Sequence, residues 1–280
     1  MTPNVRISKL EYEEIRKLFL KHFGIVLSDD ISPVADSKLS GLFEKYNIKS
    51  FNSAERPWSA DPSNRLLLEM LDILTVNHTS FFRENSHFQF LRDVVLPELN
   101  VAQNDGLIDL RFWSAACSTG EEAYSILFTM REYFGEKYHK LDGGVLATDI
   151  ALSSLRKAKA GVYRKEKLEK LPDFAKRYFT KSSALEHMVH PDIRDDVLFR
   201  WLNLHADQFP FKQQYHVIFC RNAMLYFSQE SRTILLKRLH DVLLSGGYLF
   251  IGHSETTTAI PPGLKQVAPA IFQKTKSNSQ

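Results

Sequence analysis

The stretch FWSAACSTGEEAYS, residues 112–125, decides the fold. Apolar residues precede it at the spacing of a β-strand and follow it at the spacing of an amphipathic helix. This pattern predicts a turn that carries a strand into a helix beneath a ligand, as in doubly wound sheets. The turn contains a single glycine, Gly120, and two carboxylates, Glu121 and Glu122, follow it directly.

Strand and helix patterns alternate on both sides of this turn, from about residue 105 onward. Strands are predicted in LIDLRFW (107–113), GVLATDI (144–150), VLFRWLNL (197–204), YHVIFCRN (215–222) and GGYLFIG (246–252). Helices are predicted in residues 121–134 and 228–244, the second with Ser228 as its N-cap and a glycine just past its end. The alternation predicts an α/β fold with an open, mostly parallel, doubly wound sheet. Residues 161–200 interrupt it and are expected to form an insertion.

The first 75 residues have a different texture. Apolar residues recur with helical spacing in KLEYEEIRKLFLKHF (9–23) and DSKLSGLFEKY (36–46), and a third helix is expected from about residue 64 to 76. Prolines and turn formers in residues 52–64 predict a loop. We therefore expect a small all-α N-terminal domain with a linker helix over residues 1–75, followed by the main domain over residues 76–280.

Bulk composition excludes several classes of protein. The chain has 280 residues and a formal net charge of +3, which gives no strong field for nucleic acid or an anionic membrane surface. No apolar run is long enough to insert into a membrane, and the N-terminus has no apolar core of a signal peptide. The two cysteines, Cys117 and Cys220, make no disulfide framework and are expected to be buried small residues. The expected compartment is the cytoplasm.

The opening turn favours a cationic ligand over a phosphate. A phosphate site at a helix N-terminus needs positive potential, and Glu121 and Glu122 would oppose it. The alternative is that both glutamates only complement the helix dipole. The next strand ends at Asp149, whose carboxylate can accept hydrogen bonds from both hydroxyls of a ribose, although a strand-end Asp can also cap a helix. A ribose without phosphate, next to a positive centre, indicates S-adenosylmethionine.

Two later strands also end in polar residues. Asn203 and Leu204 follow one strand, where an amide and an apolar side chain can contact an adenine. Arg221 and Asn222 end the next, and Tyr226 follows them. Arg221 can instead belong to a structural ion pair. These residues place the candidate site at the carboxyl edge of the sheet.

Six segments in this order resemble the chemotaxis receptor methyltransferases, the CheR family. They are TVNHTSFFRENSHFQFL (75–91), FWSAACSTGEEAYSI (112–126), ATDI (147–150), LNL (202–204), FCRNAMLYF (219–227) and LFIGHSE (249–255). The resemblance implies a Rossmann-like methyltransferase sheet, a small β-subdomain inserted at about 161–200 and an N-terminal helical domain. It also implies methyl transfer from S-adenosylmethionine to glutamate side chains on the cytoplasmic methylation helices of a chemoreceptor, with S-adenosylhomocysteine as product. A monomer is expected.

The resemblance assigns roles to individual residues. It implies that the cofactor is bound by Asn77, Thr79, Arg83, Glu122, Asp149, Asn203, Leu204, Arg221 and Asn222. Glu122 would neutralise the charged amino acid portion of the cofactor, and Asp149 would hold the ribose. Arg83 and Tyr226 are the candidate catalytic residues, Arg83 orienting the incoming carboxylate and Tyr226 lying near the transferred methyl group. His253 and Glu255 match a family motif and are expected to have a supporting structural role.

No metal is expected. His187, His190 and Asp192 have ligand side chains, but no closing histidine or cysteine pair follows them.

Two departures from the family concern partners. The stretch matching a basic docking helix, residues 36–50, keeps Lys38, Lys45 and Lys49 but has other residues at three positions: Gly41, Leu42 and Glu44. The inserted segment 179–196 contains no glycine, so no capture of a receptor-tail pentapeptide is expected. A methyltransferase of another chemosensory pathway and a non-catalytic cofactor-binding module therefore stay as alternatives, and a hydride-transfer enzyme is a distant one.

Overall fold

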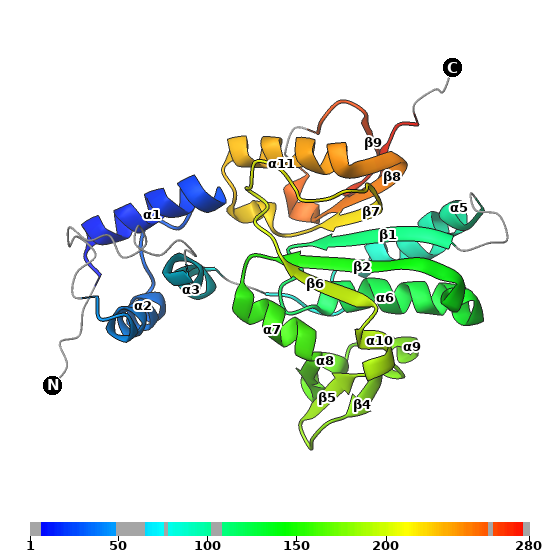
Figure 1. Cartoon of the computed structure of the whole chain (residues 1–280), viewed down its shortest axis with the longest axis horizontal. Helices are drawn as coiled ribbons and strands as arrows, with labels where there is room; N and C mark the ends of the chain where they lie inside the picture. The colour runs from blue at the N-terminus through cyan, green and yellow to red at the C-terminus, as the bar shows by residue number, and fades with distance from the viewer. Residues whose placement is uncertain (1–6, 49–64, 76–77, 102–107, 257–259, 277–280) are drawn as a thin grey trace.

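The main feature of the computed structural model is a seven-stranded sheet with helices on both faces (Figure 1). The structure describes residues 7–48, 65–75, 78–101, 108–256 and 260–276. The sheet consists of β1 (Ile108–Ala115), β2 (Leu141–Asp149), β6 (Val197–Trp201), β7 (Tyr215–Cys220), β8 (Leu243–Ile251), β9 (Leu264–Ala268) and β10 (Ile271–Lys274). Its order is β6-β2-β1-β7-β8-β10-β9, and the first five strands in this order are parallel. The predicted doubly wound α/β fold is confirmed.

Side chains alternate between the two faces of the sheet because the strand repeat is two residues. In β1, Trp113 and Ala115 belong to one buried cluster, whereas Leu110 and Phe112 belong to the other. The first cluster also contains the apolar residues of α11 (Gln229–Val242), and the second contains those of α6 (Glu121–Phe134). Both faces are therefore covered, as a parallel sheet requires.

The remaining helices of this part of the chain follow the sheet. They are α4 (Asn85–Phe90), the π-helical η1 (Leu91–Val95), α5 (Leu96–Val101), the 3₁₀ turn η2 (Gly135–Lys140), α7 (Leu152–Ala160) and the short 3₁₀ turns η3 (Met224–Tyr226) and η4 (His253–Glu255). The Ser228 hydroxyl caps α11 by accepting from the backbone N–H of Ser231, as predicted. The helix ends at Val242, earlier than predicted, because β8 already begins at Leu243.

Three N-terminal helices pack against one end of the sheet: α1 (Lys9–Phe23), α2 (Pro33–Lys45) and α3 (Arg65–Leu74) (Figure 1). Ser8 and Glu11 form a capping box at the start of α1. Buried residues of these helices share one hydrophobic cluster with β1, β7 and α11. An isolated antiparallel bridge between Ile25 and Phe227 adds a backbone link. The helices are thus continuous with the core of the sheet, and the boundary at residue 75 stays a prediction.

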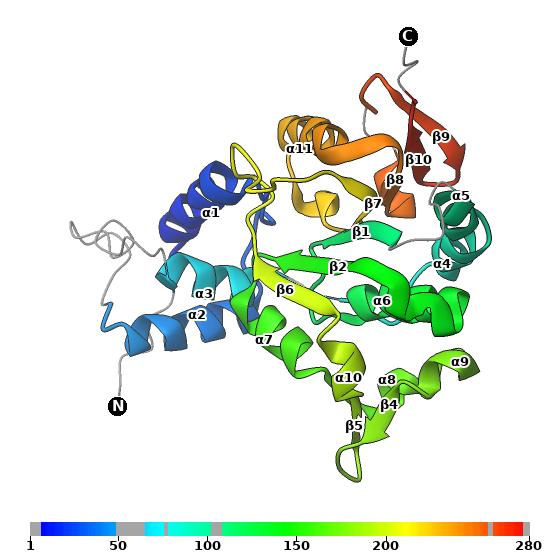
Figure 2. The same ribbon diagram turned by 45° about the vertical axis from the view of Figure 1, so that its right-hand side comes forward.

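A second, three-stranded sheet lies within the predicted insertion. It consists of β3 (Val162–Arg164), β4 (Phe179–Lys181) and β5 (Glu186–Val189) in the antiparallel order β3-β5-β4. Three one-turn helices accompany it: α8 (Lys165–Leu168), α9 (Asp173–Lys176) and α10 (Pro191–Arg194). In Figure 2 this small sheet lies on the side of α7, away from α11. The predicted boundary at 200 is too late, because Val197–Trp201 pairs with β2 in the main sheet.

None of the helices in the described residues combines the length and apolar character needed to cross a bilayer.

Candidate functional site

A cavity of about 340 Å³ lies at the carboxyl ends of β1, β2 and β7. Parallel strands bring their carboxyl ends to one edge of the sheet, and the neighbouring order β2-β1-β7 makes these three ends adjacent. Eight of the nine predicted cofactor residues line it: Thr79, Arg83, Glu122, Asp149, Asn203, Leu204, Arg221 and Asn222. Tyr226 lines it as well, and Asn77 lies outside the described residues. The structure therefore brings together every predicted site residue that it describes.

The backbone around the cavity is held in left-handed conformations. Ala116, Ser118 and Asn222 all have positive φ, at 65°, 49° and 59°. Such conformations cost a non-glycine residue free energy and concentrate at ligand sites. Gly120 has φ 95°, and a Cβ there would lie 2.9 Å from the Ala158 side chain. The single glycine of the opening turn is thus required by helix packing, while Ala116 and Ser118 line the cavity.

Asp149 joins the ends of β1 and β2. One carboxylate oxygen accepts a hydrogen bond from the backbone N–H of Ser118 at 2.7 Å, and the other accepts from Ala151 at 2.8 Å. The helix-capping alternative is not met, because the N-cap of α7 is Ala151 and Asp149 lies two residues before it. A carboxylate offers about four lone-pair sites, so acceptor capacity stays available for a ribose hydroxyl. Burial raises the pKa of Asp149 to about 6, against the opposing effect of these two N–H groups.

Glu122 presents a nearly buried carboxylate to the cavity. The Ser114 hydroxyl donates to one oxygen at 2.7 Å, and Arg221 lies 3.2 Å from the other. Burial raises the pKa of Glu122, while Arg221 and Ser114 oppose the rise. Because Glu122 is bonded on both sides, its role is more than a complement to the helix dipole.

Arg221 is the centre of a buried ion-pair network. Its guanidinium lies 3.0 Å from the Glu84 carboxylate as well as 3.2 Å from Glu122, and it donates a hydrogen bond to the Arg83 carbonyl. The side chain is 1% exposed. The structural ion pair that the sequence allowed is present, and Arg221 also lines the cavity. Arg221 thus fixes Glu122 and the backbone of Arg83 in one arrangement.

Glu121 has a different role from Glu122. Its fully buried carboxylate pairs with Lys167 of α8 and accepts a hydrogen bond from the Thr119 hydroxyl at 2.6 Å. The Tyr163 hydroxyl of β3 donates to the Thr119 carbonyl at 2.7 Å. Glu121 therefore attaches the small sheet to the opening turn, and Glu122 faces the cavity.

The N-terminal helices complete the cavity wall. The Asn203 amide donates to the His22 carbonyl at the end of α1, at 2.9 Å. Phe23 and Ile25 follow and line the cavity. Sequence reasoning placed neither residue at the site, because only a contact between distant segments brings them there. Leu204 lines the same wall and is buried.

Arg83 and Tyr226 line the cavity and are both partly exposed, so they lie at its mouth. Arg83 donates to the His78 carbonyl at 2.9 Å and is partly exposed. Tyr226 is 39% exposed, and its carbonyl accepts from the Val26 N–H at 2.7 Å. A guanidinium and a phenol at an accessible rim can meet a substrate that approaches from outside.

Glu255 holds the turn at Asn222 in place through hydrogen bonds to the backbone. Its carboxylate accepts backbone hydrogen bonds from Asn222 at 2.8 Å, Met224 at 2.8 Å and Gly252 at 2.7 Å. This agrees with the supporting structural role expected for Glu255. Cys117 and Cys220 are buried free cysteines, as predicted.

The fold and the site define a class of protein, the S-adenosylmethionine-dependent methyltransferases. The donor set suits this cofactor, because Asp149 offers an acceptor for a ribose and Glu122 offers a negative charge for an ammonium group. The buried Ser118 hydroxyl oxygen also has no hydrogen-bond partner among the described residues. The family model of the CheR methyltransferase, SAM binding domain, matches residues 77–270. The chain belongs to this family.

Known relatives match nearly the whole chain. The chemotaxis protein methyltransferase of Borreliella burgdorferi is 34% identical over 273 residues, covering 97% of this chain and 96% of the relative. Chemotaxis protein methyltransferase 1 of Pseudomonas aeruginosa is 36% identical over 273 residues, covering 95% and 98%. The chemotaxis protein methyltransferase of Escherichia coli is 32% identical over 259 residues, covering 91% and 87%. This chain is a chemotaxis-type methyltransferase that uses S-adenosylmethionine.

Proposed function

We propose that the protein methylates glutamate side chains of a chemoreceptor and forms glutamyl methyl esters for sensory adaptation. The observation that carries the proposal is the position of Arg83, which lines the cofactor cavity and is also partly exposed at its mouth. A guanidinium there can hold an incoming carboxylate through a bidentate contact. The relatives named as chemotaxis methyltransferases support a receptor as the acceptor.

The chemistry asks little of the protein beyond positioning. When bound, S-adenosylmethionine supplies a methyl group on a positively charged sulfonium, and a glutamate carboxylate accepts that methyl group as an ester. With a reference pKa of about 4.3, the acceptor is already ionised at neutral pH and needs no general base. Arg83 orients the carboxylate, Tyr226 borders the approach, and the Glu122–Arg221 pair fixes the opposite wall. Alignment of this kind can contribute up to about 7–11 kcal/mol in ideal cases.

We further propose that receptor recognition is independent of a tail pentapeptide, and that the acceptor segments are cytoplasmic methylation helices. The connection between β4 and β5, residues 182–185, is short and holds no glycine. On α2, Lys38 and Lys45 are exposed, and Lys45 pairs with Glu69 at 2.6 Å. Leu42 is a core residue and does not contribute to the exposed face of α2. On that face, only Gly41 and Glu44 therefore replace the basic residues expected from the family.

The test is a transfer assay with methyl-labelled cofactor and purified cytoplasmic fragments of candidate receptors. The expected product is label on the receptor that base releases as methanol, since an ester is hydrolysed whereas a methylamine is not. A matched fragment with its glutamates changed to alanine should stay unlabelled. Label that resists base, or binding of S-adenosylhomocysteine without transfer to any fragment, would exclude glutamate methylation.

A further inference from the structure

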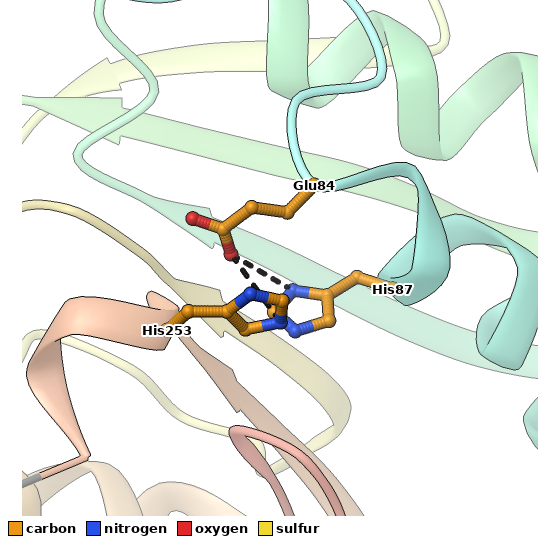
Figure 3. A group of neighbouring side chains, drawn as sticks. All are labelled: Glu84, His87 and His253. Carbon is orange, nitrogen blue, oxygen red and sulfur yellow. Dashed lines mark ion pairs between the residues drawn. The ribbon is translucent and has the colours of Figure 1, made fainter.

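Among the described residues, three ligand-type side chains converge that are not part of the cofactor cavity lining. Glu84 immediately precedes α4, His87 lies on that helix, and His253 comes from η4 at the end of β8 (Figure 3). Glu84 Oε2 lies 3.6 Å from His87 Nδ1 and 4.0 Å from His253 Nε2. The three atoms all lie within 4.8 Å of one another.

We propose that Glu84, His87 and His253 form a binding site for a divalent transition-metal ion of the zinc class. Two imidazole nitrogens and one carboxylate oxygen are a donor set that suits zinc, with a fourth position for water. Ligand atoms about 2.0–2.1 Å from a tetrahedral zinc lie about 3.3 Å apart, so the observed separations need only a modest closure. His253 is 47% exposed, which gives an ion access and gives the ring room to move.

His87 supplies the second observation. Its side chain is 1% exposed, and its Nδ1 has no hydrogen-bond partner among the described residues, although it faces the Glu84 carboxylate. Its Nε2 lies 3.4 Å from the Pro269 carbonyl. In a neutral ring only one nitrogen carries a hydrogen, so one lone pair must face an oxygen in either tautomer.

Metal binding removes this repulsion between a nitrogen lone pair and an oxygen. An ion on Nδ1 leaves Nε2–H to donate to the Pro269 carbonyl, which is the outer-shell arrangement that metal-binding histidines adopt. A neutral imidazole with a buried, unpartnered Nδ1 is the form that binds a metal ion.

Arg221 determines what such a site does. Its guanidinium lies 3.0 Å from the same Glu84 oxygen, and its Nη2 also donates a hydrogen bond to the Arg83 carbonyl. A metal ion on Glu84 weakens the Glu84–Arg221 pair, so that more of the Arg221 charge acts on Glu122. Zinc should therefore oppose a ligand that presents a positive charge to Glu122. The proposed site differs from the sequence-based expectation of no metal.

The test is zinc titration of the chelator-treated full-length protein by calorimetry and by competition with a zinc indicator. We expect one ion per chain, and H253A should weaken its affinity at least ~10-fold, the effect typical of disturbing a metal site. His190 is a matched control, since it is similarly exposed and lies 3.6 Å from Asp192, so H190A should bind zinc like the wild type. Both positions are partly exposed, and equal melting temperatures of the metal-free variants confirm that they are folded.

A second readout is the affinity for S-adenosylhomocysteine, with and without zinc. Zinc should weaken binding in the wild type and in H190A but leave H253A unchanged. No zinc binding by the wild type, equal zinc affinity in H253A, or an equal effect of zinc on the cofactor affinity of all three proteins would each overturn the proposal. These outcomes do not depend on which protein is methylated, so they are separable from the proposed function.

Discussion

The Arg221 guanidinium lies 3.2 Å from the Glu122 carboxylate, between the end of β7 and the start of α6. The same guanidinium lies 3.0 Å from Glu84, so one buried cation is shared by two carboxylates. With both carboxylates ionised, this network carries one net negative charge. A ligand ammonium group at the cavity wall would therefore balance this charge.

Glu122→Gln should weaken binding of S-adenosylhomocysteine, because the amide removes the charge that faces the ligand ammonium. Loss of one hydrogen bond to a charged group is worth about 1.5–3 kcal/mol, which corresponds to roughly 10–150-fold in affinity. Calorimetry with 5′-methylthioadenosine, which lacks the amino acid portion, is the matched comparison. Its affinity should hardly change, and equal losses for both ligands would show that the variant has altered the cavity as a whole.

Cofactor affinity should fall in mild acid through Asp149. Burial raises the pKa of Asp149 from 3.8 to about 6. Between about pH 4 and pH 6 its carboxyl group is therefore protonated in the folded protein but ionised in the unfolded chain. On this account folding stability decreases as pH rises from about 4 to about 6. Ribose hydroxyls favour the carboxylate, so S-adenosylhomocysteine should bind about tenfold more weakly at pH 5 than at pH 7. D149N should bind S-adenosylhomocysteine weakly and with little pH dependence. If the affinity of D149N changed with pH as steeply as that of the wild type, a group other than Asp149 would be responsible.

Arg83→Ala should slow methyl transfer much more than it weakens cofactor binding, because the guanidinium acts on the incoming carboxylate. The expected loss in kcat is roughly 10²–10³-fold, as for removal of other preorganised donors. Arg83→Lys keeps the charge without the bidentate geometry and should recover only part of the rate. Equal losses in transfer and in S-adenosylhomocysteine affinity would argue against a substrate role.

Glu255→Gln should destabilise the fold, because three backbone N–H groups donate to this buried carboxylate. The amide oxygen replaces only part of that set, and we expect a loss of about 2–3 kcal/mol in the free energy of unfolding. Denaturant titration measures it. Glu230→Gln, at an exposed position of α11, is the control and should change stability by less than about 0.5 kcal/mol. Equal stabilities of the two variants would contradict the role assigned to Glu255.

A receptor-tail pentapeptide should not bind to the small sheet formed by β3, β4 and β5. Calorimetry at peptide concentrations up to about 1 mM, equivalent to a binding free energy of −4.1 kcal/mol, should show no saturable heat. Micromolar binding would overturn the proposed pentapeptide independence.

The sequence by itself determined the fold class and the main polar residues of the cavity wall. Alternation in residues 107–113 and the apolar run in residues 215–220 indicate strands, and the polar strand ends at Asp149 and Arg221 are visible without coordinates. These are local signals, because a strand repeat of two residues and an abrupt polar end lie within a few positions of the chain. The Ser228 cap was predictable for the same reason.

Only the tertiary structure decided which partner each residue has. The end of α11 depends on β8 pairing with β7 from Leu243, which overrides the glycines at 246 and 247 as a helix stop. The different roles of Glu121 and Glu122 depend on Lys167 and Arg221, which come from distant elements. Long-range pairing, burial and the convergence of strand ends set these contacts, and no property of a short stretch of sequence encodes them.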